Sequence, residues 1–287
     1  MKRIKICRRR VNRSLGGTIL LFLVMLVFAL FTATPLILSI SNSFKPLDEL
    51  WLFPPKLIPI NPTGKNYSDM MTIMSNSWVP FLRYLFNTVF ITVAGTFGHV
   101  ILASMCAFPL AKKKFPGRDV IFNIIVLALM FNATVTAIPN YIIMANLKWI
   151  NTYLALIVPS FATPLGLYLM KQFMEQIPDS LLEAARIDGA GQWRIFWRIA
   201  MPNVKAAWLT LTLLQVQNLW NMGASNFIFN EELKTLSYAL GQILAGGIAR
   251  AGVGAAVTVI MMLVPITIFI TTQSSIIETM STSGMKE

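Results

Sequence analysis

An all-α integral membrane fold with six transmembrane helices is predicted by the apolar composition, by six long apolar segments and by the uneven placement of the basic residues. Of the 287 residues, 55% are hydrophobic and 13% are charged, and the mean hydropathy is +0.64. This apolar surface is too large for one core in water, so the expected solvent is a bilayer. The apolar runs are unbroken and lack the alternation of a membrane β-barrel, which leaves helices as the spanning form.

Each predicted span has about 20 residues or more, the length at which a helix crosses ~30 Å of hydrocarbon. None of the six contains Asp, Glu, Lys or Arg. The spans cover residues 17–40, 85–111, 120–145, 152–170, 206–229 and 252–277. The first run is longer than the core of a secretory signal, so we expect an uncleaved span. Residues 17–277 form one predicted domain, between a basic N-terminal segment (1–16) and a short C-terminal tail (278–287).

The net charge of +12 is explained by topology, not by nucleic-acid binding. Of the 24 basic residues, 17 fall on the side of the spans that holds both termini and 7 fall on the other side. Cytoplasmic segments carry such an excess, so both termini are predicted to be cytoplasmic. Cys7 and Cys106 fall on that side and within a span, respectively, so no disulfide is expected, and no residue pattern predicts a metal, a cofactor or a catalytic site.

The loops between the spans differ in kind. Residues 41–83 form a proline-rich external loop that excludes a long helix, with Trp51 and Trp78 available for the membrane interface. Pro116-Gly117 predicts a tight cytoplasmic turn and residues 146–151 a short outer one. Residues 171–205 are cytoplasmic and patterned as two short amphipathic helices, so they are too structured for a passive loop.

The segment 176–202 carries the most informative motif, within the run EQIPDSLLEAARIDGAGQWRIFWRIAMP. Ser180 and Glu183 have the spacing of a capping box and predict a helix start there. Gly189 is placed to end this helix in a left-handed conformation. A second helix then carries aromatic residues, which predicts a compact hairpin at the membrane surface.

This segment resembles the inner-membrane permeases of ABC importers, whose hallmark is EAA, three residues, Gly, nine residues, Ile, one residue, Leu-Pro. The matching residues are Glu183, Ala184, Ala185, Gly189, Ile199 and Pro202, with Met201 in place of the usual leucine. Asp188 and Ala190, together with Trp220-Asn221, resemble the carbohydrate branch and its smaller maltose-type subunits. The other interpretation is an ordinary amphipathic hairpin that packs under the bundle.

The resemblance implies a type I importer permease in a bacterial cell membrane, with the hairpin as the coupling helix. That helix is seated in a groove of a cytoplasmic ATPase, and its displacement switches the spans between outward and inward access. The implied partners are a second permease, two ABC ATPase subunits, an extracytoplasmic solute-binding protein, membrane lipid and a carbohydrate. This sequence has no G-x-x-x-x-G-K-[ST] loop, so it is not expected to be an enzyme.

The spans predict an uncharged polar solute, since His99 is their only titratable group apart from cysteine and tyrosine and is expected to be a packed helix contact. The candidate path residues are amides within about 160° of one face of the fifth span: Gln215, Gln217, Asn218 and Asn221. Weaker candidates are Asn87, Thr88 and Thr92 in the second span, and Asn132, Thr134, Thr136 and Asn140 in the third span, where a break is expected at Pro139. These amides and hydroxyls also suit bridges between helices. A permease for another small polar solute, a secondary carrier and a channel remain alternatives.

Overall fold

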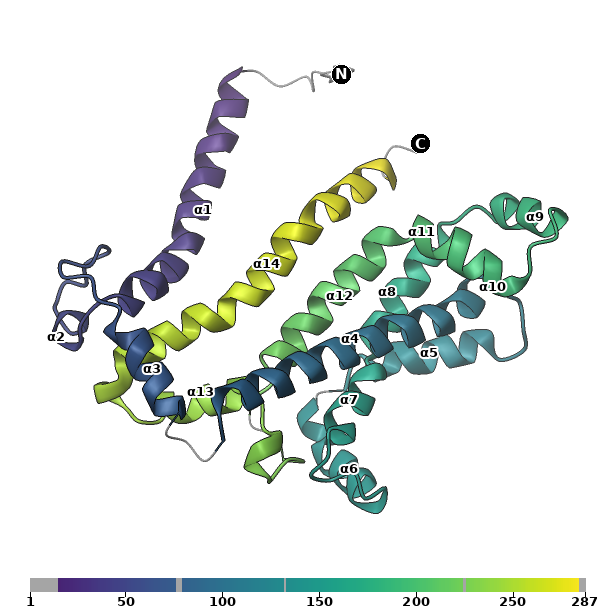
Figure 1. The fold of residues 1–287 in the computed structure, drawn as a ribbon. Coiled ribbons are helices and arrows are strands. Elements are labelled where there is room, and N and C mark those ends of the chain that lie inside the picture. The colour runs from purple at the N-terminus through teal and green to yellow at the C-terminus, as the bar shows by residue number, and fades with distance from the viewer. Residues whose placement is uncertain (1–14, 76–78, 132, 224–225, 284–287) are drawn as a thin grey trace.

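The computed structural model describes residues 15–75, 79–131, 133–223 and 226–283, and every regular element in these ranges is helical (Figure 1). The longest helices are α1 (Leu15–Ser43), α4 (Phe81–Lys112), α12 (Lys205–Trp220) and α14 (Ala251–Ser283). The others are α2 (Leu47–Leu50), α3 (Lys65–Ser75), α5 (Arg118–Ala128), α6 (Ala133–Asn146), α7 (Leu154–Phe161), α8 (Pro164–Glu175), α9 (Asp179–Ile187), α10 (Gln192–Ile195), α11 (Met201–Asn203) and α13 (Leu236–Leu244). Three single turns complete the set: the π-helical η1 (Phe196–Ala200) and the 3-10 turns η2 (Glu231–Leu233) and η3 (Ile248–Arg250).

Within the described ranges, four helical segments are long and apolar enough to cross a membrane. They are Gly16–Ser43, Phe81–Lys112, Leu154–Glu175 and Ala251–Ser274. They correspond to the first, second, fourth and sixth predicted spans, so the all-helical membrane fold is confirmed. α14 continues to Ser283, beyond the predicted end of the last span.

The third predicted span, over 120–145, is divided between α5 and α6, but the division does not lie at Pro139, where the break was predicted. The backbone N–H groups of Leu129, Met130 and Phe131 each bond to the carbonyl three residues earlier, at 3.2, 3.0 and 3.3 Å. This tightening closes α5, because the carbonyls no longer accept from residues four positions ahead. Pro139, near which a break was expected, lies inside α6, so the interruption precedes it.

The fifth span was predicted to reach Phe229, but α12 ends at Trp220. The next residues fold back as a loop whose backbone finds partners outside any helix. Asn151 supplies these contacts: its N–H donates to the Phe227 carbonyl at 2.7 Å, and its side-chain oxygen accepts from Phe229 N and Asn230 N at 3.2 and 2.8 Å. The apolar run at 227–229 is therefore loop backbone held by the connection between α6 and α7, which hydropathy alone could not distinguish from a span.

α4 is the central helix, and α7, α8 and α12 pack against it, while α14 packs against α12, α1 and α3. α1 touches the rest of the chain mainly through α14, and its most apolar window has no buried residue. Figure 1 shows the start of α1, the end of α14 and the α9–α10 segment at one end of the long helices, and α2, α3 and α6 at the other. This arrangement fits the predicted topology, in which both termini and the 176–202 segment share a side of the membrane.

Candidate functional site

α9 begins one residue before the predicted capping box. Pro178 is the N-cap residue with φ −60° and ψ 132°, and it makes no side-chain capping bond. Asp179 is the first helical residue, so Ser180 lies inside the helix and cannot cap it, and the predicted box with Glu183 was wrong. The proline fixes the extended entry to the helix without a reciprocal bond between the two side chains.

The start of α9 is fixed instead by Lys112, at the end of α4. Its Nζ donates to the carbonyls of Glu175 and Ile177 at 3.2 and 2.5 Å and forms an ion pair with Asp179 Oδ1 at 2.8 Å. The Lys112 side chain is 6% exposed and that of Asp179 is 76% exposed. Hydrogen bonding by Lys112, together with its charge, lowers the pKa of Asp179. A buried ammonium group thus connects α4, the end of α8 and the first turn of α9.

The end of α9 has the predicted left-handed glycine. Gly189 has φ +78°, its N–H donates to the Arg186 carbonyl at 3.0 Å, and the Ala190 N–H donates to the Ala185 carbonyl at 2.9 Å. This pair of bonds is a Schellman motif, which satisfies the last carbonyls of the helix. A Cβ built on Gly189 meets no atom within 4 Å, so the backbone conformation, and not space, requires glycine here.

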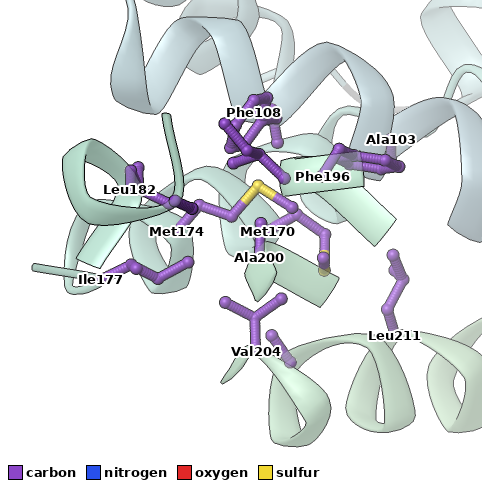
Figure 2. Packing of buried hydrophobic residues seen from close by; sticks show 14 residues of the cluster. Ala103, Phe108, Met170, Met174, Ile177, Leu182, Phe196, Ala200, Val204 and Leu211 are labelled. Carbon is purple, nitrogen blue, oxygen red and sulfur yellow. The ribbon is translucent and has the colours of Figure 1, made fainter. Parts of the chain in front are cut away.

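One face of α9 packs into the body of the protein. Leu182 lies beside Met174 of α8, in a buried cluster that also contains Met170, Phe108 and Phe196, from α8, α4 and η1 (Figure 2). Ala185 belongs to the same cluster and is 8% exposed. The methyl group of Ala185 therefore faces this chain's own core, which leaves Ala184 as the small residue on the outer surface of the helix.

The outer face of α9 is free within the described chain and mixes apolar and polar groups. Glu183, Ala184 and Asp188 are exposed, and so are Leu181 and Ile187, the latter at 86%. The sequence analysis did not single out these two exposed apolar residues. The helical period contained the signal, since Ile187 is about 140° from Leu182 and about 160° from Ala185 at ~100° per residue.

The second half of the hairpin is helical, as predicted, but includes a π turn at Phe196–Ala200 just before Pro202. Such turns accommodate a residue that the regular ladder cannot, and Pro202 lacks the N–H that an α-helix would bond. Phe196 is buried and meets Phe108 edge-on at 5.6 Å between centroids, while Trp193 and Trp197 are exposed. Ile199 packs at the edge of the same cluster.

The amides of α12 divide into two groups. Gln215 is buried, and its Nε2 donates to the Ser160 carbonyl at 3.1 Å, a bridge from α12 to α7. Gln217, Asn218 and Asn221 are exposed, and Asn221 Nδ2 donates to the Gln217 carbonyl at 2.9 Å. The Gln215 side chain therefore donates to a neighbouring helix, and the other three amides face an open surface.

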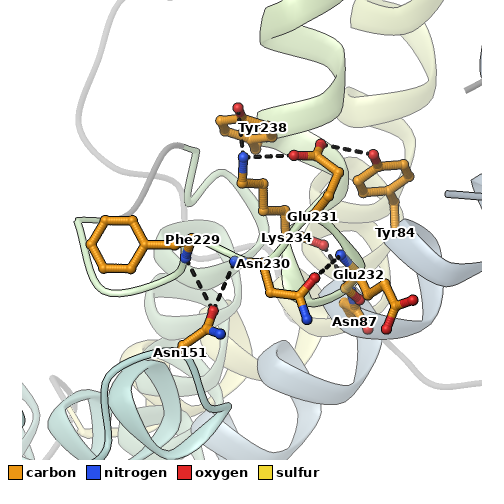
Figure 3. Close-up of polar contacts among 9 residues, drawn as sticks. All are labelled: Tyr84, Asn87, Asn151, Phe229, Asn230, Glu231, Glu232, Lys234 and Tyr238. Atoms are coloured by element: carbon orange, nitrogen blue, oxygen red, sulfur yellow. Dashed lines mark hydrogen bonds and ion pairs between the residues drawn. The ribbon is translucent and has the colours of Figure 1, made fainter. Parts of the chain in front are cut away.

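Two of the weaker path candidates hold the loop that follows α12 (Figure 3). Asn87 is buried on α4, donates to the Glu232 and Lys234 carbonyls at 2.8 Å each, and accepts from Tyr153 Oη at 2.7 Å. Thr88 Oγ1 accepts from Leu236 N at 2.7 Å. Their polar atoms are engaged in these contacts, so they act as anchors for residues 231–236. Asn140 is exposed, and Asn132 lies outside the described residues.

An ion-pair network stiffens the same loop. Lys234 Nζ contacts Glu231 Oε2 at 2.6 Å and Tyr238 Oη at 2.8 Å, and Glu231 Oε1 accepts from Tyr84 Oη at 2.9 Å (Figure 3). Burial opposes the charge on Lys234, but the hydrogen bonds to Glu231 and Tyr238 outweigh it and raise the pKa of the ammonium group. The loop after α12 is thus a built structure on the α4–α7 framework.

A long groove of about 1100 Å³ lies between α4, α12 and α14. Its lining is almost entirely apolar and runs from Leu85, near the start of α4, to Trp197 and Lys205, beside the hairpin. Thr92 and Thr96 line it one turn apart, and their buried hydroxyls have no hydrogen-bond partner among the described residues. Both hydroxyls are themselves buried, so the surface that the groove presents is apolar.

His99 is buried, and its Nδ1 lies 2.9 Å from the Phe161 carbonyl, as expected for a packed contact between α4 and α7. In the described part of the chain no cluster of His, Cys, Asp and Glu has the arrangement of a metal site. Cys106 lies in α4 as a free thiol, and Cys7 lies outside the described residues.

Comparison with known proteins gives consistent matches. The family profile described as "Binding-protein-dependent transport system inner membrane component" matches residues 99–279. The sn-glycerol-3-phosphate transport system permease protein UgpE of Yersinia enterocolitica is 34% identical over 178 residues, 61% of this chain and 63% of the relative. The diacetylchitobiose uptake system permease protein NgcG of Streptomyces coelicolor is 27% identical over 199 residues, 69% of this chain and 64% of the relative. The matched segments thus span less than two thirds of these relatives' own lengths.

A solved structure supports the same fold. The chain aligns with a bacterial ABC transporter involved in the import of the acidic polysaccharide alginate, with a TM-score of 0.77 and 24% identity, over 92% of this chain and 99% of that one. At this identity the likeness concerns the fold. With the family match and the apolar helices, it makes this chain a multi-pass membrane protein.

Proposed function

We propose, from the premise that this chain belongs to the family of binding-protein-dependent transport system inner membrane components, that it is a permease subunit of an ATP-driven carbohydrate importer. A separate cytoplasmic ATPase supplies the energy, and an extracytoplasmic binding protein delivers the solute. Both termini lie in the cytoplasm of a bacterial cell.

The single observation that carries the proposal is the geometry of α9. One face of this helix is packed into the protein and its ends are fixed by Lys112 and by the left-handed Gly189, while the opposite face is free. That free face presents the small Ala184, the apolar Ile187 and the acidic Glu183 together. A short rigid helix with this surface suits insertion into a groove of a partner protein. This is the helix-in-groove mode of recognition.

The hairpin is suited to transmit displacement because it is continuous with the bundle. Leu182 and Phe196 pack against α4 and α8, and Lys112 joins α9 directly to α4. Since packed cores transmit motion as rigid units, a force applied to α9 would move the helix ends that meet it. Glu183, Ala184, Asp188 and Gly189 form the proposed coupling surface or its frame, while Ala185, Ile199 and Pro202 seat it.

The long α4–α12–α14 groove supports a second permease subunit as a direct partner. Its apolar lining and the unburied surface of α1 are both features that a second helical subunit would cover. The solute path would then lie between the two subunits, lined from this chain by the exposed amides Gln217, Asn218 and Asn221. Gln215 would act mainly as a bridge to α7.

An uncharged solute fits the spans better than an anionic one. The relatives include a permease named for diacetylchitobiose, a carbohydrate, and one named for sn-glycerol-3-phosphate, an anion. The six predicted spans contain no Lys or Arg, and an anion in a low-dielectric path needs a cationic partner. A carbohydrate needs only hydroxyl and amide partners, which this chain has.

The test is reconstitution of the full complex in proteoliposomes with the ATPase, the partner permease and the binding protein. Uptake of a radiolabelled oligosaccharide should require ATP inside the vesicles and the binding protein outside. Uptake driven by a proton or sodium gradient without ATP would identify a secondary carrier instead. Uptake of glycerol-3-phosphate in preference to any sugar would assign the permease to an anionic solute.

A further inference from the structure

We propose that a second groove, between the C-terminal end of α4 and α10, binds one anionic phospholipid. The groove has a volume of about 320 Å³ and is separate from the long groove described above. Its lining residues are Met105, Phe108, Pro109, Lys113, Gln192, Trp193 and Phe196. The volume is within the roughly 300 to 1000 Å³ of small-molecule sites, at the low end, which suits part of an acyl chain.

The walls of the groove are apolar and well defined. Phe196 is fixed by an edge-on contact with Phe108 at 5.6 Å, and Trp193 stands perpendicular to Phe196 at 6.4 Å between centroids. Trp193 is nevertheless 64% exposed, so the described chain leaves one side of this wall uncovered. Tryptophan prefers the headgroup level of a bilayer, where its ring is apolar and its N–H remains available. This level also fits α4, whose apolar span ends at Lys112.

The positive charge of Lys113, at the rim of this second groove, favours an anionic ligand. Lys112 is occupied by Asp179 and two carbonyls, whereas the Lys113 ammonium group has no hydrogen bond or ion pair with any described residue. No carboxylate lines the groove, and Gln192 adds an amide that can donate to a phosphate oxygen. An unpaired cation beside an apolar groove at the membrane surface matches a phosphate group on an acyl chain.

Alternative occupants use only part of this surface. Free phosphate would contact Lys113 and Gln192 but leave the aromatic wall uncovered, and a zwitterionic lipid would fill the wall but gain less from the unpaired lysine. An anionic phospholipid such as phosphatidylglycerol uses both. Its position beside Phe196 would place a lipid directly against the core that seats α9.

The experiment is native mass spectrometry of the full chain in detergent, titrated with phosphatidylglycerol or phosphatidylcholine and compared across three variants. Lys113→Gln removes the rim charge, Trp193→Ala removes the exposed wall, and Lys114→Gln is the matched control. Lys114 is the next residue, is exposed, and does not line the groove. Lys113→Arg keeps the charge and tests whether the site survives a change of side chain.

The wild-type chain should retain one phosphatidylglycerol more tightly than phosphatidylcholine. Lys113→Gln should weaken that lipid about fivefold, or about 1 kcal/mol for one basic residue at a membrane surface, and leave phosphatidylcholine unchanged. Trp193→Ala should weaken both lipids, and Lys113→Arg and Lys114→Gln should behave as wild type.

Three results would overturn the proposal. One is the absence of a lipid preference in the wild-type chain, and another is an equal loss in the Lys113→Gln and Lys114→Gln variants, which would indicate diffuse surface charge. The third is displacement of the lipid when the ATPase binds or when inorganic phosphate is added, which would assign the groove to a protein contact or a free anion.

Discussion

Replacing Gly189 by valine tests the proposed coupling segment at a residue where the substitution changes the backbone conformation alone. Gly189 has φ +78°, and no atom lies within 4 Å of a Cβ built on it. The substitution therefore creates no clash with neighbouring residues and acts through the backbone alone. An L-residue in the left-handed region costs about 1–2 kcal/mol, and a β-branched residue is at the upper end of that range.

The chain can relieve this cost only by changing the end of α9. Moving residue 189 out of the left-handed region breaks the bonds from Gly189 N to Arg186 O and from Ala190 N to Ala185 O. The outer face of α9 would then tilt, while Lys112 still holds its first turn. A penalty of 1–2 kcal/mol corresponds to a roughly 5- to 30-fold change in the population of the intact end.

The matched control is Gly191→Val, two residues further along the chain. Gly191 also has nothing within 4 Å of its built Cβ, but its φ of −68° and ψ of 162° suit valine. Gly189→Asn is an intermediate case, because asparagine tolerates the left-handed region better than other residues do. We expect the order wild type ≈ Gly191→Val, then Gly189→Asn, then Gly189→Val.

The assays are amide hydrogen exchange over residues 179–192, co-purification of the ATPase, and solute-stimulated ATP hydrolysis in the reconstituted complex. Gly189→Val should exchange faster at the end of α9, retain less ATPase and lose stimulation. If exchange increases but association and stimulation stay at wild-type levels, α9 does not couple to the ATPase. If Gly189→Val and Gly191→Val behave alike, the backbone argument itself is wrong.

Three further predictions address other parts of the molecule. Because the pKa of Asp179 is lowered, its ion pair with Lys112 stabilises the folded state at pH values above the ordinary pKa of 3.8, and this stabilisation is lost as the pH falls through the lower folded pKa. Amide protection at the start of α9 should therefore be constant from about pH 7 to 5 and fall in stronger acid. Asp179→Asn should lack this acid-dependent loss. Asn221→Leu and Gln217→Leu should reduce uptake without reducing assembly, and unchanged uptake in both would remove them from the path. Gln215→Leu removes one of the two side-chain donors to the Ser160 carbonyl and should lower the free energy of unfolding by about 1 kcal/mol. Single cysteines at Ser180 and Asn61, both exposed, should label from opposite sides of the membrane in a background without Cys7 and Cys106, and labelling of both from outside intact cells would contradict the topology.

The sequence was sufficient to predict the structure wherever one local property, such as hydropathy or the conformational preference of a residue, decided it. Apolar runs without charge predicted the long helices, and the position of Gly189 after a short amphipathic run predicted its positive φ. The clustering of proline in residues 41–83 excluded a long helix there, and the longest helix found is α3, with 11 residues. In each case the deciding property is local, either the solvation of side chains or the conformation of one residue.

Predictions failed where tertiary contacts decide between local alternatives. Residues 227–229 are as apolar as a span, but Asn151, distant in sequence, supplies their backbone partners. Ser180 and Glu183 have a capping-box spacing, but the N-cap residue is Pro178, two residues before Ser180, and Lys112 from α4 holds the first helical residue, Asp179. Gln215 shares a helical arc with the exposed amides, yet the Ser160 carbonyl is within its reach. Sequence reports which bonds a residue can form, while packing selects the one it forms.

The position of α4 explains how these separate sites can act together. From its first to its last turns this helix carries Asn87, which holds the loop after α12, Thr92 and Thr96 in the long groove, and Lys112, which holds α9. A helix of 32 residues rises about 48 Å at ~1.5 Å per residue, enough to connect both membrane surfaces without a flexible joint. Pro109 is the one proline inside α4 and lies within its last turn. The helix is therefore not kinked by proline between the contacts with the loop after α12 and the groove. A displacement of α9 on its partner would therefore reach the groove and the loop after α12 through one rigid element. Lys112→Met should accordingly lower the rate of solute uptake by a larger factor than it lowers the amide protection of α9.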